Sequence, residues 1–425
     1  MNLLLLGSGG REHAVAWKIS KSSHCENLFI APGNAGTAEV GVNVPLALND
    51  FDAIKKFCRK EKIDMVFVGP EEPLVNGIVD SFLEDDMVKH ISVIGPSREA
   101  AKLEGSKAFA KSFMMRHNIP TANYREFDSE NFQEGIPYLQ GMSLPIVLKA
   151  DGLAAGKGVI ICQSHVEAMS EYELMIHQSK FGEAGKKVVV EEFLEGIEMS
   201  VFVLTDGKNY VVLPEAKDYK KINEGDKGPN TGGMGAVSPV VFADNTYMQK
   251  VKDRVIIPTM EGLKKDNIDY RGFIFIGLIK VGDEPFVIEY NCRLGDPETE
   301  VVIPRLKNDL VELFLATANG KLDTITLEED ERVACAVMAV SGGYPGNYEK
   351  GYKISGLDVT LANSMIFHSG TAVKDGYVVT NGGRVLCVTS FGSTVDEAAE
   401  RSLAALDDMY FEDMFYRADI GYEFR

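Results

Sequence analysis

The sequence predicts an α/β protein that begins with a doubly wound parallel-sheet domain and ends in a small α+β domain. Near the N-terminus, short apolar strands alternate with amphipathic helices, and glycine-rich or proline-containing turns follow the strands. The length of 425 residues exceeds what one hydrophobic core usually organises. We therefore expect three domains, at 1–104, 105–325 and 326–425.

The N-terminal elements are expected in strict alternation. The strands are predicted at 2–7, 27–33, 64–72 and 91–97, with helices at 11–20 and 52–61. In such a sheet the ligand binds beyond the carboxyl ends of the strands. Those ends carry the turns 7–10, 31–34 and 69–71, so we expect these turns to lie near a ligand.

Downstream elements follow in a less regular order. A helix at 102–117 precedes a small sheet with strands at 144–152, 157–164 and 187–196 and a helix at 165–178. The next block has strands at 272–282 and 285–292 and helices at 246–266 and 306–319. The acidic segment 323–331 is predicted to be a linker, and the tail has a strand at 333–341 and a helix at 395–409.

Composition excludes several classes of protein. A formal net charge of −19 argues against nucleic acid or an anionic membrane as partner, because affinity for either depends on neutralising phosphate. The six cysteines are far apart and lack a CxxC pair, which favours reduced thiols over disulfides or zinc. The apolar run at 3–6 is too short for a secretory signal and no later run reaches membrane-spanning length, so we expect a cytoplasmic protein.

The turn after the first strand nearly matches the dinucleotide fingerprint G-x-G-x-x-G. Gly7 and Gly9 fit, but Glu12 occupies the third glycine position, and no carboxylate closes the second strand. We therefore expect backbone N–H groups at a helix N-terminus, with Arg11 in its first turn, to hold a single phosphate. The alternative is a tight turn that only lets the helix pack on the sheet.

The segment KADGLAAGKG, at 149–158, places glycines and two lysines between two strands. It lacks the spacing and the Ser or Thr of a Walker A loop. Its glycines at 152, 156 and 158 nevertheless let backbone amides approach phosphate oxygens, and Lys149 and Lys157 add positive charge. The alternative is a solvated hairpin.

The segment VIEYNCRLGDPETE, at 287–300, is the second centre of predicted chemistry. On a strand, Glu289 and Asn291 share one face with Val287, whereas Ile288 points to the other. Carboxylate and amide oxygens suit Mg²⁺, which also binds substrate phosphates. Arg293 follows immediately, so groups for cations and anions meet at one strand end; an ordinary polar strand end is the alternative.

Two further segments carry weaker signals. GPNTGGMGA, at 228–236, has four glycines, which indicates close approach of the backbone to a ligand, and the cluster at 217–221 just upstream is either a binding element or a solvated face. In VVVEEFLEGIEMS, at 188–200, Phe193 and Leu194 could clamp a flat ring while Glu198 reaches sugar hydroxyls. A plain surface strand end is the alternative for the second segment.

Together these parts indicate ATP and a divalent ion between a lysine-bearing lid and an acidic strand, with a separate phosphate site at the N-terminal sheet. That combination predicts a ligase. The order of the motifs also resembles the phosphoribosylamine–glycine ligase family of ATP-grasp enzymes over nearly the whole chain, carried by GGREHA, APGNAGT, GPEEPLV, EGSKAFAK, KADGLAAGKG, EEFLEGIE, GPNTGGMGA, EYNCRLGDPETE and TNGGRVLCVT.

The resemblance implies an ATP-grasp central domain with a small mobile lid at about 120–192. It implies ATP-dependent ligation of glycine to 5-phosphoribosylamine through a glycyl phosphate, in purine biosynthesis, with ATP as co-substrate and Mg²⁺ or Mn²⁺ as cofactor. Small molecules are then the partners, with no nucleic acid or membrane. A monomer or weak homodimer is expected.

By motif position, the resemblance assigns residues to four groups. ATP is expected to contact Lys107, Lys149, Gly152, Gly156, Lys157, Gly158, Glu191, Glu192, Phe193, Leu194 and Glu198. The metal is expected on Glu289 and Asn291, and the catalytic residues are expected to be Arg293, Lys149 and Asp218. Substrates are expected to contact Gly9, Gly10, Arg11, Asn34, Glu71, Asp218, Lys220, Gly232, Gly233, Arg293, Gly295 and Asp296.

One departure from the family pattern concerns the glycine pocket. Where the family usually has Gln-Asp-His-Lys-Arg, this chain has Lys217, Asp218, Tyr219, Lys220 and Lys221. Asp218 and Lys220 are kept, but an imidazole and a guanidinium are lost, and Arg and Lys are not interchangeable at a bidentate site. The alternatives for the whole chain are another ATP-grasp ligase or carboxylase of purine synthesis, a nicotinamide-dependent oxidoreductase and a non-catalytic nucleotide sensor.

Overall fold

A five-stranded parallel sheet organises the N-terminal part of the chain, which confirms the predicted α/β class. The strand order is β3-β2-β1-β4-β5, so the sheet winds outward in both directions from its central strand. The strands are β1 (Asn2–Gly7), β2 (Asn27–Pro32), β3 (Val42–Asn43), β4 (Met65–Val68) and β5 (Ser92–Ile94). The helices are α1 (Gly10–Ile19), α2 (Thr37–Val40), α3 (Phe51–Lys60), α4 (Glu71–Val75) and α5 (Ile78–Leu83).

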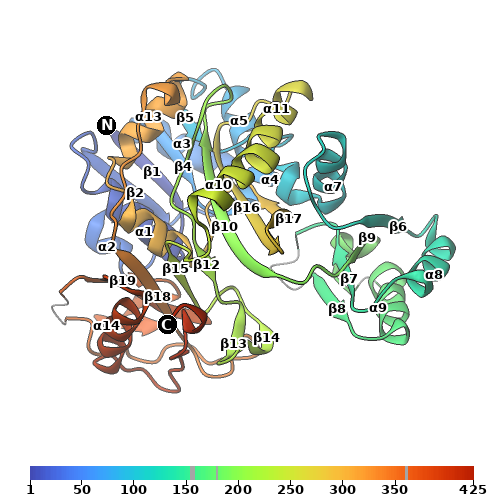
Figure 1. The fold of residues 1–425 in the computed structure, drawn as a ribbon. Helices are drawn as coiled ribbons and strands as arrows, with labels where there is room; N and C mark the ends of the chain where they lie inside the picture. The colour runs from blue at the N-terminus through green and yellow to red at the C-terminus, as the bar shows by residue number, and fades with distance from the viewer. Residues whose placement is uncertain (154–157, 179, 359–361) are drawn as a thin grey trace.

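The computed structural model describes residues 1–153, 158–178, 180–358 and 362–425. Figure 1 shows a body of packed sheets from which a smaller lid projects to one side. The lid sheet has the order β6-β9-β7-β8 and consists of β6 (Tyr124–Asp128), β9 (Lys187–Glu192), β7 (Ile146–Ala150) and β8 (Val159–Cys162). Its helices are α8 (Phe132–Gly141), α9 (His165–His177) and the short η1 (Gly182–Lys186).

The lid has a hydrophobic core of its own. Phe127, Leu139, Tyr172 and Val190 are buried in a cluster that contains no buried residue from the body. A separate core marks the lid as a structural unit of its own within the chain.

The body sheet lies beside the lid and has the antiparallel order β11-β10-β16-β17. Its strands are β10 (Ile197–Thr205), β11 (Tyr210–Val212), β16 (Gly272–Val281) and β17 (Glu284–Asn291). A helical run covers this sheet, formed by α10 (Asn245–Val251), the π-helical η2 (Lys252–Ile256) and α11 (Ile257–Lys265). The run matches the helix predicted at 246–266.

The C-terminal sheet includes two strands from the preceding region. Its order is β12-β15-β18-β22-β19, with β12 (Lys217–Asp218), β15 (Gly235–Ser238), β18 (Val333–Val340), β22 (Arg384–Gly392) and β19 (Ser364–His368). The long helix here is α14 (Val395–Asp407), and the hairpins are β13 (Lys221–Asn223) with β14 (Lys227–Asn230) and β20 (Thr371–Lys374) with β21 (Tyr377–Thr380). Short 3₁₀ turns are η3 (Leu322–Thr324) and η4 (Tyr422–Phe424).

Several predicted elements differ from the structure. The strand expected at 64–72 ends at Val68, and Glu71 begins helix α4. The helix expected at 102–117 is two helices, α6 (Lys102–Gly105) and α7 (Lys107–Arg116), because Ser106 is extended at φ −140° and its hydroxyl caps α7 by accepting from Phe109 N–H. The helix expected at 306–319 begins only at α13 (Leu310–Asn319), where the Asp309 side chain caps it. A helix that was not predicted, α12 (Thr299–Arg305), precedes residues 306–309, and the expected linker is anchored through a bridge between Leu306 and Glu329.

No helix of the described ranges is long and apolar enough to cross a bilayer.

Two buried histidines join the N-terminal and C-terminal parts. His13 of α1 accepts a hydrogen bond at Nδ1 from the backbone N–H of His368, at 2.8 Å, and the two rings lie 5.6 Å apart. Burial lowers the pKa of His13 to about 3, with His368 adding to the effect, and burial lowers the pKa of His368 to about 4.

We expect these histidines to weaken the fold at acid pH. Both are neutral when folded at pH 6.5, whereas the unfolded chain takes up protons near that pH, so stability is lost as pH falls from about 6.5 towards about 4. Each extra proton on the unfolded chain costs about 1.4 kcal/mol per pH unit. Urea unfolding across this range should show a shallower pH slope in His13→Asn, which keeps an acceptor but does not titrate; an unchanged slope would contradict the assignment.

Candidate active site

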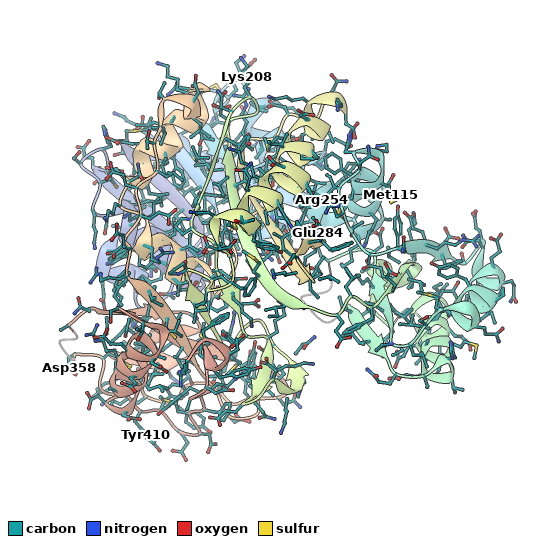
Figure 2. All side chains as sticks on the ribbon, in the orientation of Figure 1. Met115, Lys208, Arg254, Glu284, Asp358 and Tyr410 are labelled. Carbon is teal, nitrogen blue, oxygen red and sulfur yellow. The ribbon has the colours of Figure 1, made fainter. Side chains whose placement is uncertain are left out.

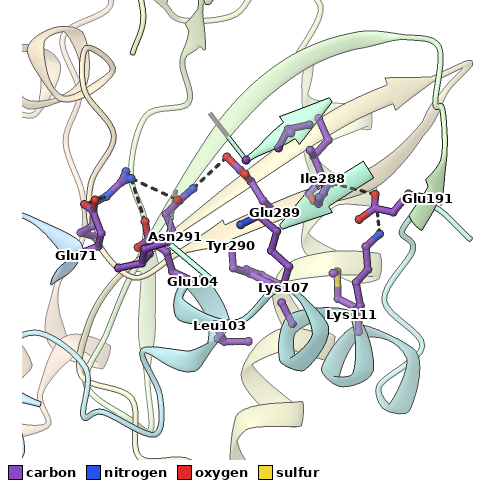
Figure 3. A pocket seen from close by; sticks show the side chains of 17 residues that line it. Glu71, Leu103, Glu104, Lys107, Lys111, Glu191, Ile288, Glu289, Tyr290 and Asn291 are labelled. Carbon is purple, nitrogen blue, oxygen red and sulfur yellow. Dashed lines mark hydrogen bonds and ion pairs between the residues drawn. The ribbon is translucent and has the colours of Figure 1, made fainter. Parts of the chain in front are cut away.

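A cavity lies where the lid meets the body, and it joins the two predicted centres of chemistry. Its lining includes Lys107 of α7, Lys149 of β7, Glu191 of β9, and Glu289 and Asn291 of β17 (Figure 3). A second cavity shares Lys149 and Glu191 and extends along the lid. Residues more than a hundred positions apart in the sequence therefore line the same cavity.

The strand end that carries Glu289 and Asn291 is shaped by a bulge. The pairing of β17 with β16 shifts between Gly277 and Leu278, so that Glu289 faces Gly277 and Val287 faces Leu278. Val287 is consequently buried in the core, which corrects the prediction that it shares a face with the two polar residues. Ile288, predicted to point away, lines the cavity instead.

Glu289 and Asn291 lie side by side as predicted. Asn291 Nδ2 donates to Glu289 Oε1 at 3.4 Å, and Asn291 Oδ1 accepts from Arg293 Nη2 at 3.4 Å. A carboxylate and an amide oxygen form a hard donor set, and the cavity leaves space beside them, so the pair fits Mg²⁺ or Mn²⁺.

The lysines reach the same cavity from two sides. Lys107 starts α7 and donates to the carbonyl of Gly152 at 3.2 Å, and burial lowers its pKa although Glu289 opposes this. Lys149 lies near the end of β7, forms an ion pair with Glu191 Oε2 at 2.9 Å and donates to the Ile288 carbonyl at 3.3 Å. Cationic groups therefore face the acidic strand end.

The loop between β7 and β8 is described only at its edges. Gly158 lines the cavity, and Gly152 lies in a neighbouring pocket of the lid, beside Ala184. Gly156 and Lys157, both predicted ATP contacts, lie outside the described residues. The second cavity is lined by Glu192, Phe193, Leu194 and Glu198, the residues expected to hold the base and ribose.

Arg293 connects the strand end that carries Glu289 and Asn291 to the N-terminal sheet. Its guanidinium forms ion pairs with Glu71 Oε2 at 3.1 Å and with Glu104 Oε1 at 3.0 Å. Burial alone would raise the pKa of Glu71, but Arg293 and Arg11 hold it below its usual range. Burial raises the pKa of Glu104, although the positive charge of Arg293 acts to lower it. Glu104 was not predicted, because on a helix it resembles an ordinary exposed carboxylate.

The turn that was predicted to bind a phosphate makes several hydrogen bonds within the protein. Glu12 accepts from Gly9 N–H at 2.6 Å and from Arg11 Nε at 2.6 Å, and Arg11 Nη1 donates to the Leu294 carbonyl at 3.0 Å. A Cβ atom on Gly7 would lie 2.3 Å from the Glu12 side chain. Glu12, which stands at the third glycine position of the fingerprint, therefore fills the space beside Gly7. The guanidinium of Arg11 is thus engaged within the protein, and Asn34 binds the Ser8 and His368 carbonyls at 2.8 and 2.7 Å.

In the segment 217–221, residues that keep the family pattern alternate with residues that depart from it. Asp218 and Lys220 form an ion pair at 2.8 Å, and Lys220 also pairs with Glu198 at 2.7 Å. Lys217 and Tyr219 instead both contact the carboxylate of Glu423, each at 2.8 Å. Two of the three departures from the family pattern, Lys217 and Tyr219, therefore face the C-terminal segment and leave the kept pair in place.

An arginine from the C-terminal sheet brings two predicted substrate loops together. Arg384 Nη1 donates to the carbonyls of Gly232 and Asp296, both at 2.7 Å, and forms an ion pair with Asp296 Oδ1 at 3.0 Å. A Cβ on Gly233 would lie 2.4 Å from Pro297, so only glycine allows this approach. Arg384 was overlooked, although it lies in TNGGRVLCVT.

Two carboxyl groups of the GDPETE segment were also overlooked. Glu298 is buried, accepts from Ser200 Oγ at 3.1 Å, and burial together with Asp218 raises its pKa to about 7. Burial also raises the pKa of Glu300, next to Gly10. Gly295 packs directly on Glu298, where a Cβ would lie 2.4 Å from Oε2.

The three-part architecture and the lid over this cleft define an ATP-grasp protein. Family descriptions match the chain in three consecutive parts: the N domain of phosphoribosylglycinamide synthetase at 1–104, its ATP-grasp (A) domain at 105–299 and its C domain at 334–423. The chain belongs to the phosphoribosylglycinamide synthetase family, and the resemblance found in the sequence is confirmed.

Similar proteins agree with this assignment. The chain is 46% identical to phosphoribosylamine–glycine ligase of Escherichia coli K12, over 99% of this chain and 98% of that protein, and 45% identical to the Pasteurella multocida enzyme with the same coverage. The Thermotoga maritima phosphoribosylamine–glycine ligase structure is 36% identical, with a TM-score of 0.84, and the match covers 99% of this chain and 100% of that one. A biotin carboxylase–ATP analogue complex from Campylobacter jejuni shares the fold alone, at 16% identity and a TM-score of 0.73 over 98% of this chain and 93% of that one.

Proposed function

We propose that this chain ligates glycine to 5-phosphoribosylamine at the expense of ATP, releasing ADP and phosphate. The observation that supports this most is that Lys107, Lys149, Glu289 and Asn291 line one cavity beneath the lid. Family membership and relatives at 46% identity over nearly the full length carry the choice of substrates. The reaction transfers the γ-phosphoryl to the glycine carboxylate and then joins the substrate amine to the glycyl carbon, with loss of phosphate.

The charge of each cleft residue determines which part of ATP or which ion it binds. Lys107 and Lys149 bind phosphate oxygens, and the backbone at Gly152 and Gly158 approaches the same groups. Glu289 and Asn291 hold Mg²⁺ or Mn²⁺, which when bound neutralises charge on the transferring phosphoryl group. The segment from Glu191 to Leu194, with Glu198, holds the base and ribose.

The other two substrates approach from the body side of the cleft. Asp218, with Lys220, and Arg293 bind the charged ends of glycine. The turn at Gly9 and Gly10, with Arg11, Asn34 and Glu71, holds phosphoribosylamine, while Gly232, Gly233, Gly295 and Asp296 line the junction where the two meet. Positioning and charge stabilisation account for the chemistry without a protein nucleophile.

Release of ADP, measured with and without glycine and freshly generated phosphoribosylamine, tests the proposal. We expect ADP to form only when ATP, Mg²⁺, glycine and phosphoribosylamine are all present. Glycine-independent ADP release with bicarbonate would instead support a carboxylase of the same superfamily. We further propose that the active species is a monomer or weak homodimer, which sedimentation velocity at two protein concentrations tests.

A further inference from the structure

The C-terminal end of the chain packs against the hairpin that follows Asp218 and Lys220. Arg417 is fully buried there, donates from Nη1 to the Lys221 carbonyl at 3.0 Å and forms an ion pair with Asp226 Oδ1 at 2.8 Å. Both partners belong to the hairpin of β13 and β14, and Figure 1 shows the end of the chain beside it. The chain beyond Lys220 is therefore anchored by the C-terminal end.

Glu423, near the end of the chain, binds the segment on the other side of the hairpin. Its Oε1 pairs with Lys217 Nζ at 2.8 Å, and its Oε2 accepts from Tyr219 Oη at 2.8 Å. Lys217 is 7% exposed and Tyr219 is 1% exposed, and a buried donor is costly unless a polar group receives it. Burial, together with the charge of Glu423, raises the pKa of Tyr219, so its hydroxyl stays protonated and donates. Each oxygen of Glu423 thus serves one buried donor.

The strand between these contacts is too short to be fixed by backbone pairing alone. β12 is two residues long and pairs with β15 in two register positions. Successive side chains of an extended segment point to opposite faces. Lys217 and Tyr219 reach Glu423 on one face, and Asp218 and Lys220 form their ion pair, at 2.8 Å, on the other. The contacts on the first face therefore set how the second face is presented.

We propose that Glu423 is a positioning residue for the amino-acid substrate. By holding Lys217 and Tyr219 on one face, it sets the position of Asp218 and Lys220 on the other, where a small zwitterion places a charged end. The proposal rests on the function proposed above, because Asp218 with Lys220 binds glycine there. Lys217 and Tyr219 are two of the departures from the family pattern, so this way of fixing the pocket depends on residues particular to this chain.

ADP release by the full chain, measured with glycine varied and the other substrates saturating, tests this role. Glu423→Gln leaves one side-chain acceptor for the two donors Lys217 and Tyr219, so β12 shifts or a buried donor loses its partner. We expect the KM for glycine to rise about ten-fold, because a small misplacement of a binding group is costly. The KM for ATP should change by less than about two-fold, because Lys220 contacts Glu198 through a half-exposed ion pair, and such pairs contribute little.

A second substitution should reverse the effect of the first. In Lys217→Gln combined with Glu423→Gln, the amide at 423 can accept from Tyr219 Oη and donate to the amide oxygen at 217, so no buried donor is left over. We expect the KM for glycine to return to within about two-fold of the original value. A purely structural role predicts no such recovery. Glu412→Gln, which changes an exposed carboxylate of the same terminal segment, is the matched control and should behave as the unaltered chain does.

Tyr219→Phe decides the matter if Glu423→Gln does not fold, because it keeps the buried ring and removes one of the two contacts. It should raise the KM for glycine by a smaller factor and leave the KM for ATP unchanged. An unchanged KM for glycine in the folded variants, a parallel rise in the KM for ATP, or no recovery in the double variant overturns the proposal. Absence of glycine-dependent ADP release by the unaltered chain would defeat the proposed function, and this proposal with it.

Discussion

Glu289→Ala is expected to abolish glycine-dependent ADP formation while leaving the fold intact. The side chain lines the cavity opposite Lys107 and has Asn291 as its one hydrogen-bond partner among the described residues, at 3.4 Å, so its removal disturbs little packing. A lost metal ligand removes charge stabilisation at the transferring phosphoryl group, and we expect turnover to fall on the order of a thousand-fold or more. Steady-state ADP release and thermal unfolding measure the two effects.

Glu284→Ala provides a matched control on the same strand. Glu284 lies at the opposite end of β17, where it pairs with Lys250 and Arg254 at the surface (Figure 2). Exposed ion pairs contribute about 0–1 kcal/mol, so this variant should retain activity and nearly all stability. Turnover by Glu289→Ala within a few-fold of that control, at saturating Mg²⁺, would exclude Glu289 from the metal site.

Arg293→Met is expected to damage both activity and stability. The guanidinium compensates Glu104 and Glu71 and contacts Asn291, so its loss leaves the buried Glu104 carboxyl group without its counter-charge, whereas Glu71 keeps Arg11 nearby. Breaking a buried ion pair costs about 3–5 kcal/mol. We expect the midpoint of urea unfolding to drop accordingly and ADP formation to fall at least a hundred-fold, by the order of magnitude for a lost charge-stabilising donor.

A double variant separates the two roles of Arg293. Adding Glu104→Gln to Arg293→Met removes the stranded carboxyl while keeping an acceptor for the Cys292 N–H, which Glu104 Oε2 binds at 2.7 Å. Part of the lost stability should return, because the uncompensated charge is gone. Activity should stay low. If activity returned together with stability, the role of Arg293 would be structural only.

Local patterns explain why much of the site could be predicted. Strand alternation placed Glu289 and Asn291 on one face, and both line the cavity. Lys149 was expected to bring positive charge to a phosphate-binding loop, and it lines the cavity, where it pairs with Glu191. These predictions depended on features within a few residues of each other, which secondary structure fixes directly.

Other features depend on contacts between distant segments. The bulge that buries Val287 arises from the pairing with β16, which no pattern within β17 encodes. Glu104 and Lys111 were not predicted to be part of the site, because their partners lie far along the chain, at Arg293 and Glu191. The break at Ser106 divides that helix and lets Lys107 begin a new one at the cavity.

The sequence by itself determined the family, the order of the three parts and the chemical groups that the cleft contains, because motifs, strand alternation and glycine turns are local properties of the chain. Only the tertiary structure decided which charges share a partner, which carboxyl groups are raised in pKa and which buried oxygens have no hydrogen-bond partner among the described residues. The physical reason is that Coulomb energy and desolvation depend on distance and burial, and both are set by the packing of segments remote in sequence.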